Sequence, residues 1–143
     1  MTREITMIVV HCSATRCNHP YTVHQLYHDH VEVNHWRYIG YHFFISRDGK
    51  VHATRPLERM GAHARGWNAH SIGICYEGGL DEKGKPADTR TPAQKESLED
   101  LLYSLALDYP GAEILGHRDL PWVRKSCPCF DVKEWLKEID FHL

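Results

Sequence analysis

The segment ITMIVVHC, residues 5–12, contains the longest apolar run of the chain. β-Branched side chains over residues 5–10 predict a strand that is buried on both faces, as in the centre of a sheet. His11 follows this strand directly, and a second histidine, His117, follows another short strand-like segment at residues 112–115. If these two strands run parallel, their carboxyl ends share one edge of the sheet and both imidazoles reach the same point.

The segments around this strand alternate between helix and strand patterns. Thr22 with Gln25, and Thr91 with Gln94, each fit the capping box that begins a helix. Further strands are expected at residues 41–46, 51–54, 71–77 and 112–115, and a last helix is expected to begin after Asp131. This order predicts the α/β (α+β) class, with a single domain over residues 1–143 and a central mixed β-sheet covered by helices.

The composition excludes several classes of protein. Of 143 residues, 42% are hydrophobic and 25% are charged, a balance typical of a folded domain rather than a disordered chain. The formal net charge of −2 gives no cationic excess, so neither nucleic acid nor a membrane surface is expected as a partner. The amino terminus has no long apolar segment typical of a signal peptide, so we expect the chain to be cytoplasmic as synthesised.

Twelve histidines and five cysteines make metal binding a natural hypothesis. Cys127 lies ten residues after His117, in a loop that can bring its thiolate to the two imidazoles. Two imidazoles and one thiolate, from His11, His117 and Cys127, are typical of catalytic zinc, which keeps one position for water. A fourth ligand from Cys129 or Cys12 would instead make a closed structural site, and the spacing leaves both arrangements open.

Eight short segments occur in an order and spacing that match one known family. They are VVHCSAT (9–15), GYHF (40–43), RDG (47–49), GAHA (61–64), NAHSIGI (68–74), TPAQ (91–94), GHRD (116–119) and CP (127–128). From about residue 5 to residue 136, the chain resembles the type 2 N-acetylmuramoyl-L-alanine amidases. The resemblance is to the branch that includes phage lysozymes of the amidase type and, more distantly, the peptidoglycan recognition proteins.

This resemblance implies an enzyme that hydrolyses the amide bond between N-acetylmuramic acid and L-alanine in peptidoglycan, in cell-wall lysis or turnover. It implies one Zn²⁺ per chain, held by His11, His117 and Cys127, and peptidoglycan or a muropeptide as the substrate. We expect a monomer. Without a signal peptide, the protein would reach the cell wall after holin-type release or lysis.

The resemblance also implies roles for residues around the metal. Tyr41 and Lys125 match catalytic positions of the phage branch, where the phenol orients water or assists proton transfer and the cation stabilises the oxyanion. The loop that contains His63, Arg65 and Asn68 is expected beside the substrate groove, where Arg65 can pair with stem-peptide carboxylates. Some relatives outside this branch use a glutamate near the position of Cys75, so the general base is left unassigned.

Two other functions are compatible with these motifs. Some relatives bind peptidoglycan without cutting it, typically after losing the metal thiolate, and a closed zinc site would suit a protein that acts through contact with another protein. Cys12 and Cys17 lie in a region where some secreted relatives have a disulfide, but we expect reduced thiols because no signal peptide is evident.

Overall fold

The computed structural model describes residues 3–143. Its strands are β1 (Met7–Cys12), β2 (Thr15–Arg16), β3 (Phe43–Ile45), β4 (Val51–Ala53), β5 (Ser71–Tyr76), β6 (Gly79–Leu80) and β7 (Glu113–Gly116). Its α-helices are α1 (Val23–Tyr27), α2 (Pro92–Asp108) and α3 (Val132–Glu138), and its shorter helical segments are η1 (His28–Val33), η2 (Asn68–His70) and η3 (His117–Asp119). Across residues 3–143, the helices all fall short of the length and apolar character that a bilayer crossing requires.

The main sheet has the strand order β4-β3-β5-β1-β7. β1 pairs in parallel with β5 on one side and with β7 on the other, whereas β3 and β4 form an antiparallel hairpin. The sheet is therefore mixed, and β1 lies inside it between two parallel partners, which explains why the segment from Ile8 to Val10 is fully buried. The predicted fold class is confirmed.

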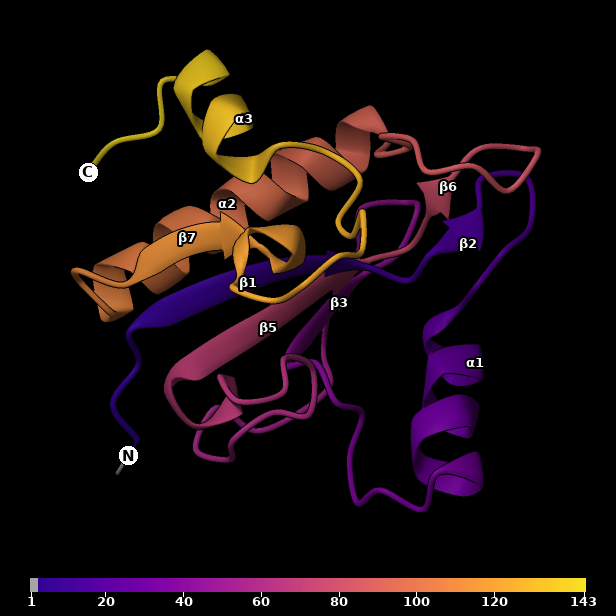
Figure 1. Cartoon of the computed structure of the whole chain (residues 1–143), viewed down its shortest axis with the longest axis horizontal. Coiled ribbons are helices and arrows are strands. Elements are labelled where there is room, and N and C mark those ends of the chain that lie inside the picture. The colour runs from indigo at the N-terminus through magenta and orange to yellow at the C-terminus, as the bar shows by residue number, and fades with distance from the viewer. Residues whose placement is uncertain (1–2) are drawn as a thin grey trace.

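The two faces of the sheet are covered differently, because successive side chains of a strand point to opposite faces. Ile8 and Val10 pack in the larger core cluster with leucines of α2, and α3 adds Trp135 to the same cluster. On the other face, Leu26 of α1 packs with Phe44 in a smaller cluster. Figure 1 shows α2 and α3 on one side of the sheet and α1 on the other. His11 alternates with Ile8 and Val10 along β1, so its side chain lies on the face of the sheet away from α2.

The helix starts were readable from sequence. Thr22 and Thr91 each accept a hydrogen bond from the backbone N–H three residues on, and the Gln25 and Gln94 side chains complete both capping boxes. The last helix begins after Asp131 as predicted, and the Asp131 side chain caps it by accepting the backbone N–H of Glu134. These contacts satisfy N–H groups that have no partner inside the helix.

Several details differ from the sequence-based expectation. The first strand begins at Met7 and continues through Cys12, so His11 lies within β1 instead of directly after it. The strand expected at residues 41–46 is shorter, β3, although the His42 backbone still donates its N–H to the Gly73 carbonyl and accepts the N–H of Thr54. Helix α1 continues as the π-helical segment η1, in which Asn34 N–H bonds to the Asp29 carbonyl five residues back. The small parallel pair β2–β6 was not predicted, because two-residue strands carry no alternation that a sequence pattern could reveal.

Candidate metal centre

The parallel pairing of β1 with β7 places two histidines together. In the register of this pair Val10 lies opposite Gly116, so His11 and His117 each occupy the next position at the same edge of the sheet. Their ring centroids are 4.5 Å apart. The expectation that two parallel strands would bring these imidazoles to one point is confirmed.

Cys127 reaches this edge on a loop that the sheet holds in place. The backbone N–H of Arg118, which follows His117, donates to the Cys127 carbonyl at 2.8 Å, and the Tyr76 hydroxyl donates to the Pro128 carbonyl at 2.6 Å. Gly116 permits this approach, because a Cβ atom there would lie 2.8 Å from the Pro128 ring. The Cys127 sulfur accepts the backbone N–H of Cys12 at 3.2 Å, a contact that stabilises a thiolate.

The three side chains fit the donor set of a zinc ion. One donor atom from each of His11, His117 and Cys127 lies within 4.8 Å of the other two, and the His11 Nδ1 and Cys127 Sγ atoms are 4.0 Å apart. Donors on one tetrahedral zinc lie about 3.3–3.8 Å apart, given Zn–N and Zn–S bonds of about 2.0 and 2.3 Å, so small shifts would close the set. His11 is 2% exposed, whereas His117 and Cys127 are half-buried, so the centre opens to solvent on their side.

The protonation of the histidines also suits metal binding. Burial lowers the pKa of His11 well below its usual value, and burial together with the charge of Lys125 lowers the pKa of His117. Both imidazoles are therefore neutral at pH 7, the form that binds a metal.

The other cysteines near the centre are not members of this donor set. Within residues 3–143, the group that could hold a metal consists of the three residues above, without Cys12 or Cys129. The sulfurs of Cys12 and Cys129 lie 3.8 Å from each other, and Cys12 and Cys17 are both free thiols. The geometry thus favours the arrangement with three protein ligands over the closed one.

His63 is partly buried and lies directly against His11. Its Nδ1 atom is 2.8 Å from His11 Nε2, and its Nε2 atom is 3.2 Å from the Ser71 hydroxyl. Because His11 Nδ1 faces Cys127, the proton of His11 belongs on Nε2 and is donated to His63. Burial lowers the pKa of His63 to about 3, which keeps it a neutral acceptor. The sequence gave no indication of this contact, and a contact of His63 with the substrate stays a prediction.

The ring of His63 can lie so close to the sheet because of a glycine. A Cβ atom on Gly73 would be 2.6 Å from the His63 ring. Gly73 also donates its backbone N–H to Nδ1 of the fully buried His42, whose Nε2 bonds to the Arg59 carbonyl. The sheet therefore holds the imidazole that orients His11.

Tyr41 and Lys125 both lie near the cluster. The centroid of the Tyr41 ring is 5.1 Å from that of His11, and burial raises the pKa of its phenol well above the usual value, so the hydroxyl stays protonated and can donate. Lys125 is exposed, and its charge contributes to the lowered pKa of both histidine ligands. Their catalytic roles stay predictions.

The remaining predicted residues, Arg65 and Asn68, lie in the loop after His63. The side-chain Oδ1 of Asn68 accepts the backbone N–H groups of His63 and Ala64, so this side chain closes the loop. Arg65 is exposed and lines a groove of about 510 Å³ that extends from His117. Contact of either side chain with a substrate stays a prediction.

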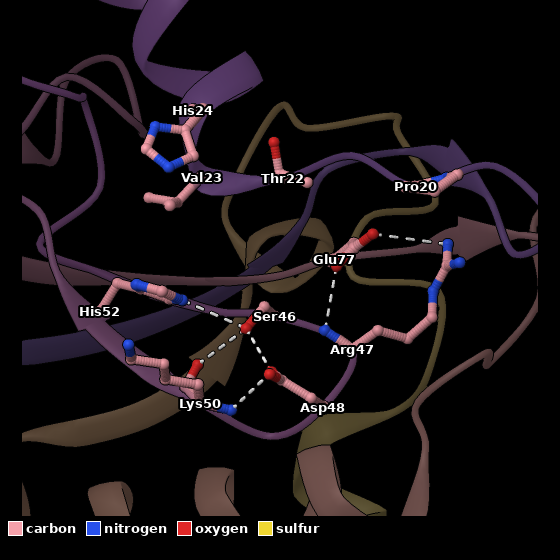
Figure 2. Close-up of a pocket in the computed structure, with 10 residues that line it drawn as sticks. All are labelled: Pro20, Thr22, Val23, His24, Ser46, Arg47, Asp48, Lys50, His52 and Glu77. Carbon is pink, nitrogen blue, oxygen red and sulfur yellow. Dashed lines mark hydrogen bonds and ion pairs between the residues drawn. The ribbon is translucent and has the colours of Figure 1, made fainter.

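A second cavity, of about 460 Å³, lies between the start of α1 and the β3–β4 hairpin (Figure 2). None of the three candidate metal ligands lines it. The buried Glu77 carboxylate accepts the backbone N–H groups of Tyr21 and Arg47 and pairs with the Arg47 guanidinium at 3.7 Å. Ser46 donates to Asp48 within the hairpin. These polar groups satisfy one another, so Glu77 joins three segments of the fold and is not placed to act at the metal centre.

The chain is similar to known endolysins and amidases over nearly its whole length. The chain is 44% identical to the endolysin of Escherichia phage T7 over 95% of its own length and 89% of the relative, and 42% identical to the endolysin of Klebsiella phage KP32 over 95% and 88%. Its structure matches the N-acetylmuramoyl-L-alanine amidase LysC from Clostridium intestinale with a TM-score of 0.78 and 29% identity, covering 98% of this chain and 88% of that one. Drosophila PGRP-LB, at 20% identity and a TM-score of 0.74 over 96% and 82%, shares the fold.

A family model described as N-acetylmuramoyl-L-alanine amidase matches residues 1–130, a span that includes all three candidate metal ligands. With the resemblance to phage endolysins over nearly the whole chain, this match establishes the family. The chain therefore belongs to the N-acetylmuramoyl-L-alanine amidase family.

Proposed function

We propose that this chain, as a single domain and a monomer, hydrolyses the amide bond between N-acetylmuramic acid and L-alanine in peptidoglycan with one zinc ion. The observation that carries the proposal is the cluster of two neutral imidazoles and one thiol at the edge of the sheet, open to solvent beside a groove. Relatives named as endolysins and as N-acetylmuramoyl-L-alanine amidases support the reaction class.

His11, His117 and Cys127 would hold the metal. Zinc in such a site supplies a Lewis acid that polarises the scissile carbonyl and lowers the pKa of water to about 7. The protein fixes the geometry of this centre through the hydrogen bond from His11 to His63 and through the backbone N–H donated to the Cys127 sulfur. Rigid donors matter because the catalytic groups must keep their alignment with the substrate.

Tyr41 and Lys125 supply the groups that act on the substrate. The Tyr41 hydroxyl keeps its proton and can donate a hydrogen bond to the attacking water or to the scissile amide. The Lys125 ammonium group, exposed at the mouth of the centre, can stabilise the negative charge that develops on the carbonyl oxygen. Arg65, at the rim of the groove, is suited to pairing with a carboxylate of the stem peptide.

The proposal is tested with purified protein and soluble muropeptides. We expect new L-alanine amino groups to appear, the reaction to stop with a chelator, and activity to return with added zinc. Cys127→Ser should lose metal and activity together, whereas Cys17→Ser, which changes a thiol outside the cluster, should keep both. Tight binding of muropeptides without any product would instead identify a peptidoglycan-binding module.

We further infer that the protein acts on the cell wall after holin-type release or lysis, as the phage endolysins among its relatives suggest. Expression inside bacteria should leave the cells intact until the inner membrane is permeabilised, and lysis should then require the intact metal cluster. Lysis without permeabilisation would contradict this inference.

A further inference from the structure

The groove beside His117 is lined by two tryptophans. Trp67 follows the loop that Arg65 occupies, and Trp122 lies in the loop that joins the candidate ligands His117 and Cys127. The groove has a volume of about 510 Å³, within the range of roughly 300–1,000 Å³ typical of small-molecule sites. Because His117 is part of its wall, a molecule bound in this groove lies directly against the metal centre.

Trp122 is held in an unusual position. It is 96% exposed, the most exposed of the large hydrophobic residues that the structure describes. Its backbone has a φ angle of 69°, in the left-handed region that bulky L-residues rarely adopt. An indole that is almost entirely exposed, on a disfavoured backbone conformation, indicates a side chain kept available for a ligand.

Trp67 differs because it is anchored. It packs against the buried cluster that contains Val9, Leu115 and Leu120, and it is half-buried. The groove therefore has one fixed aromatic wall backed by the core and one aromatic wall that projects into solvent, with Arg65 at its rim. Such a surface suits a small ligand that has an apolar face and polar edges.

We propose that Trp67 and Trp122 form a saccharide subsite that holds the glycan part of the substrate beside His117. This inference rests on the proposed function and adds the direction in which the substrate lies. A pyranose ring has one face of C–H groups that stacks on an indole, and its hydroxyl and acetamido groups remain at the edges, where they reach solvent and Arg65.

The chemistry of the substrate explains why the sugar belongs at this position. The bond to be cut joins the lactyl group on the muramoyl ring to L-alanine, so the sugar lies one short substituent away from the reacting carbonyl. The groove begins at a metal ligand, so it satisfies this requirement.

The first test is kinetic and uses the zinc-loaded protein with a disaccharide-tetrapeptide muropeptide. Trp122→Ala should lower kcat/KM at least about tenfold, mainly through a higher KM, because an exposed aromatic anchor contributes binding rather than chemistry. Trp122→Phe keeps an aromatic face and should stay within about threefold of the wild type. Leu107→Ala, which removes an exposed apolar side chain on α2, is the matched control and should be unchanged.

The second test uses the N-acetylglucosaminyl-N-acetylmuramic acid disaccharide, which has no stem peptide. Its titration should change the indole fluorescence of the wild type, and Trp122→Ala should abolish most of this change. Equal kcat/KM for Trp122→Ala and wild type would overturn the subsite. So would a kinetic loss without disaccharide binding, since that would assign the groove to the peptide. Both outcomes assume an active wild type; a wild type without amidase activity refutes the proposed function instead.

Discussion

Replacement of His63 by phenylalanine tests whether a residue that does not contact the metal controls its affinity. His63 Nδ1 accepts a hydrogen bond from His11 Nε2 at 2.8 Å. Phenylalanine keeps an aromatic ring of similar size but has no hydrogen-bond acceptor. Loss of such a partner of a histidine ligand costs roughly 10–100-fold in metal affinity, or about 1.4–2.8 kcal/mol. The three ligands themselves are unchanged, so binding should weaken rather than disappear.

Zinc affinity is best measured by competition with a chromophoric chelator at pH 7.5. His63→Gln should recover part of the loss, because an amide oxygen can accept the His11 proton. His70→Phe is the matched control: His70 is an exposed histidine whose Nδ1 contacts the Glu4 carbonyl, and its replacement should leave affinity unchanged. An affinity within twofold of wild type for His63→Phe would refute the reasoning. A complete loss, equal to that of His11→Ala, would show instead that His63 is itself a ligand.

Four further outcomes are expected. Cys129→Ser should retain one zinc per chain in elemental analysis, because its sulfur lies outside the three-ligand cluster; loss of zinc would indicate a closed site. Tyr41→Phe and Lys125→Ala should keep zinc but lower kcat by about 10²–10³-fold in the muropeptide assay, since each removes a group proposed to act on the reacting atoms, and full turnover by either would exclude its role. Burial lowers the pKa of His42 from 6.5 to about 4, so between these values the unfolded state binds a proton that the folded state rejects, and stability falls as the pH falls. In urea unfolding of metal-free protein, the contribution of His42 to the free energy of unfolding should be smaller by about 2 kcal/mol at pH 5 than at pH 8. The free energy of unfolding of His42→Gln should correspondingly depend less on pH. Leu102→Ala, which leaves a cavity at a fully buried position between α2 and the sheet, should lower the free energy of unfolding by about 2–5 kcal/mol in the same assay. A decrease of less than about 1 kcal/mol would contradict the packing described.

The parts of the structure that sequence could predict are those with a local signal. The β-branched run at the start of the chain identified a central strand, and Thr22 and Thr91 marked helix starts through a partner three residues away. The pair His11 and His117 was predictable for a related reason. His11 lies near the carboxyl end of β1 and His117 directly follows β7, so the pairing of these two parallel strands fixes both positions at once.

The role of His63 had no such signal. It lies 52 residues from His11, in a loop without regular structure, and its place depends on the missing side chain of Gly73. A glycine within a strand pattern suggests a close approach of another group, but it does not identify which group approaches. The sequence therefore grouped His63 with Arg65 and Asn68 as neighbours along one loop, although the three side chains face different surroundings.

The choice between Cys127 and Cys129 shows the same limit in a sharper form. The two residues are separated by one position, and both can bind zinc as thiolates. The fold separates them through backbone geometry: Cys129 has a φ angle of 68°, and its sulfur lies 3.8 Å from that of Cys12. The Cys127 sulfur instead accepts the Cys12 backbone N–H and approaches His11.

The three candidate ligands are held in place in two different ways. Two ligands lie at the carboxyl ends of paired strands, where backbone pairing fixes them, and the third is carried by a loop that two hydrogen bonds hold against the sheet. The same loop carries Lys125 and Trp122, so the groups proposed to stabilise charge and to bind the glycan move with the thiolate. A change that displaced this loop would therefore affect metal binding, turnover and substrate affinity together, whereas a change at Tyr41 or His63 would affect one of them first.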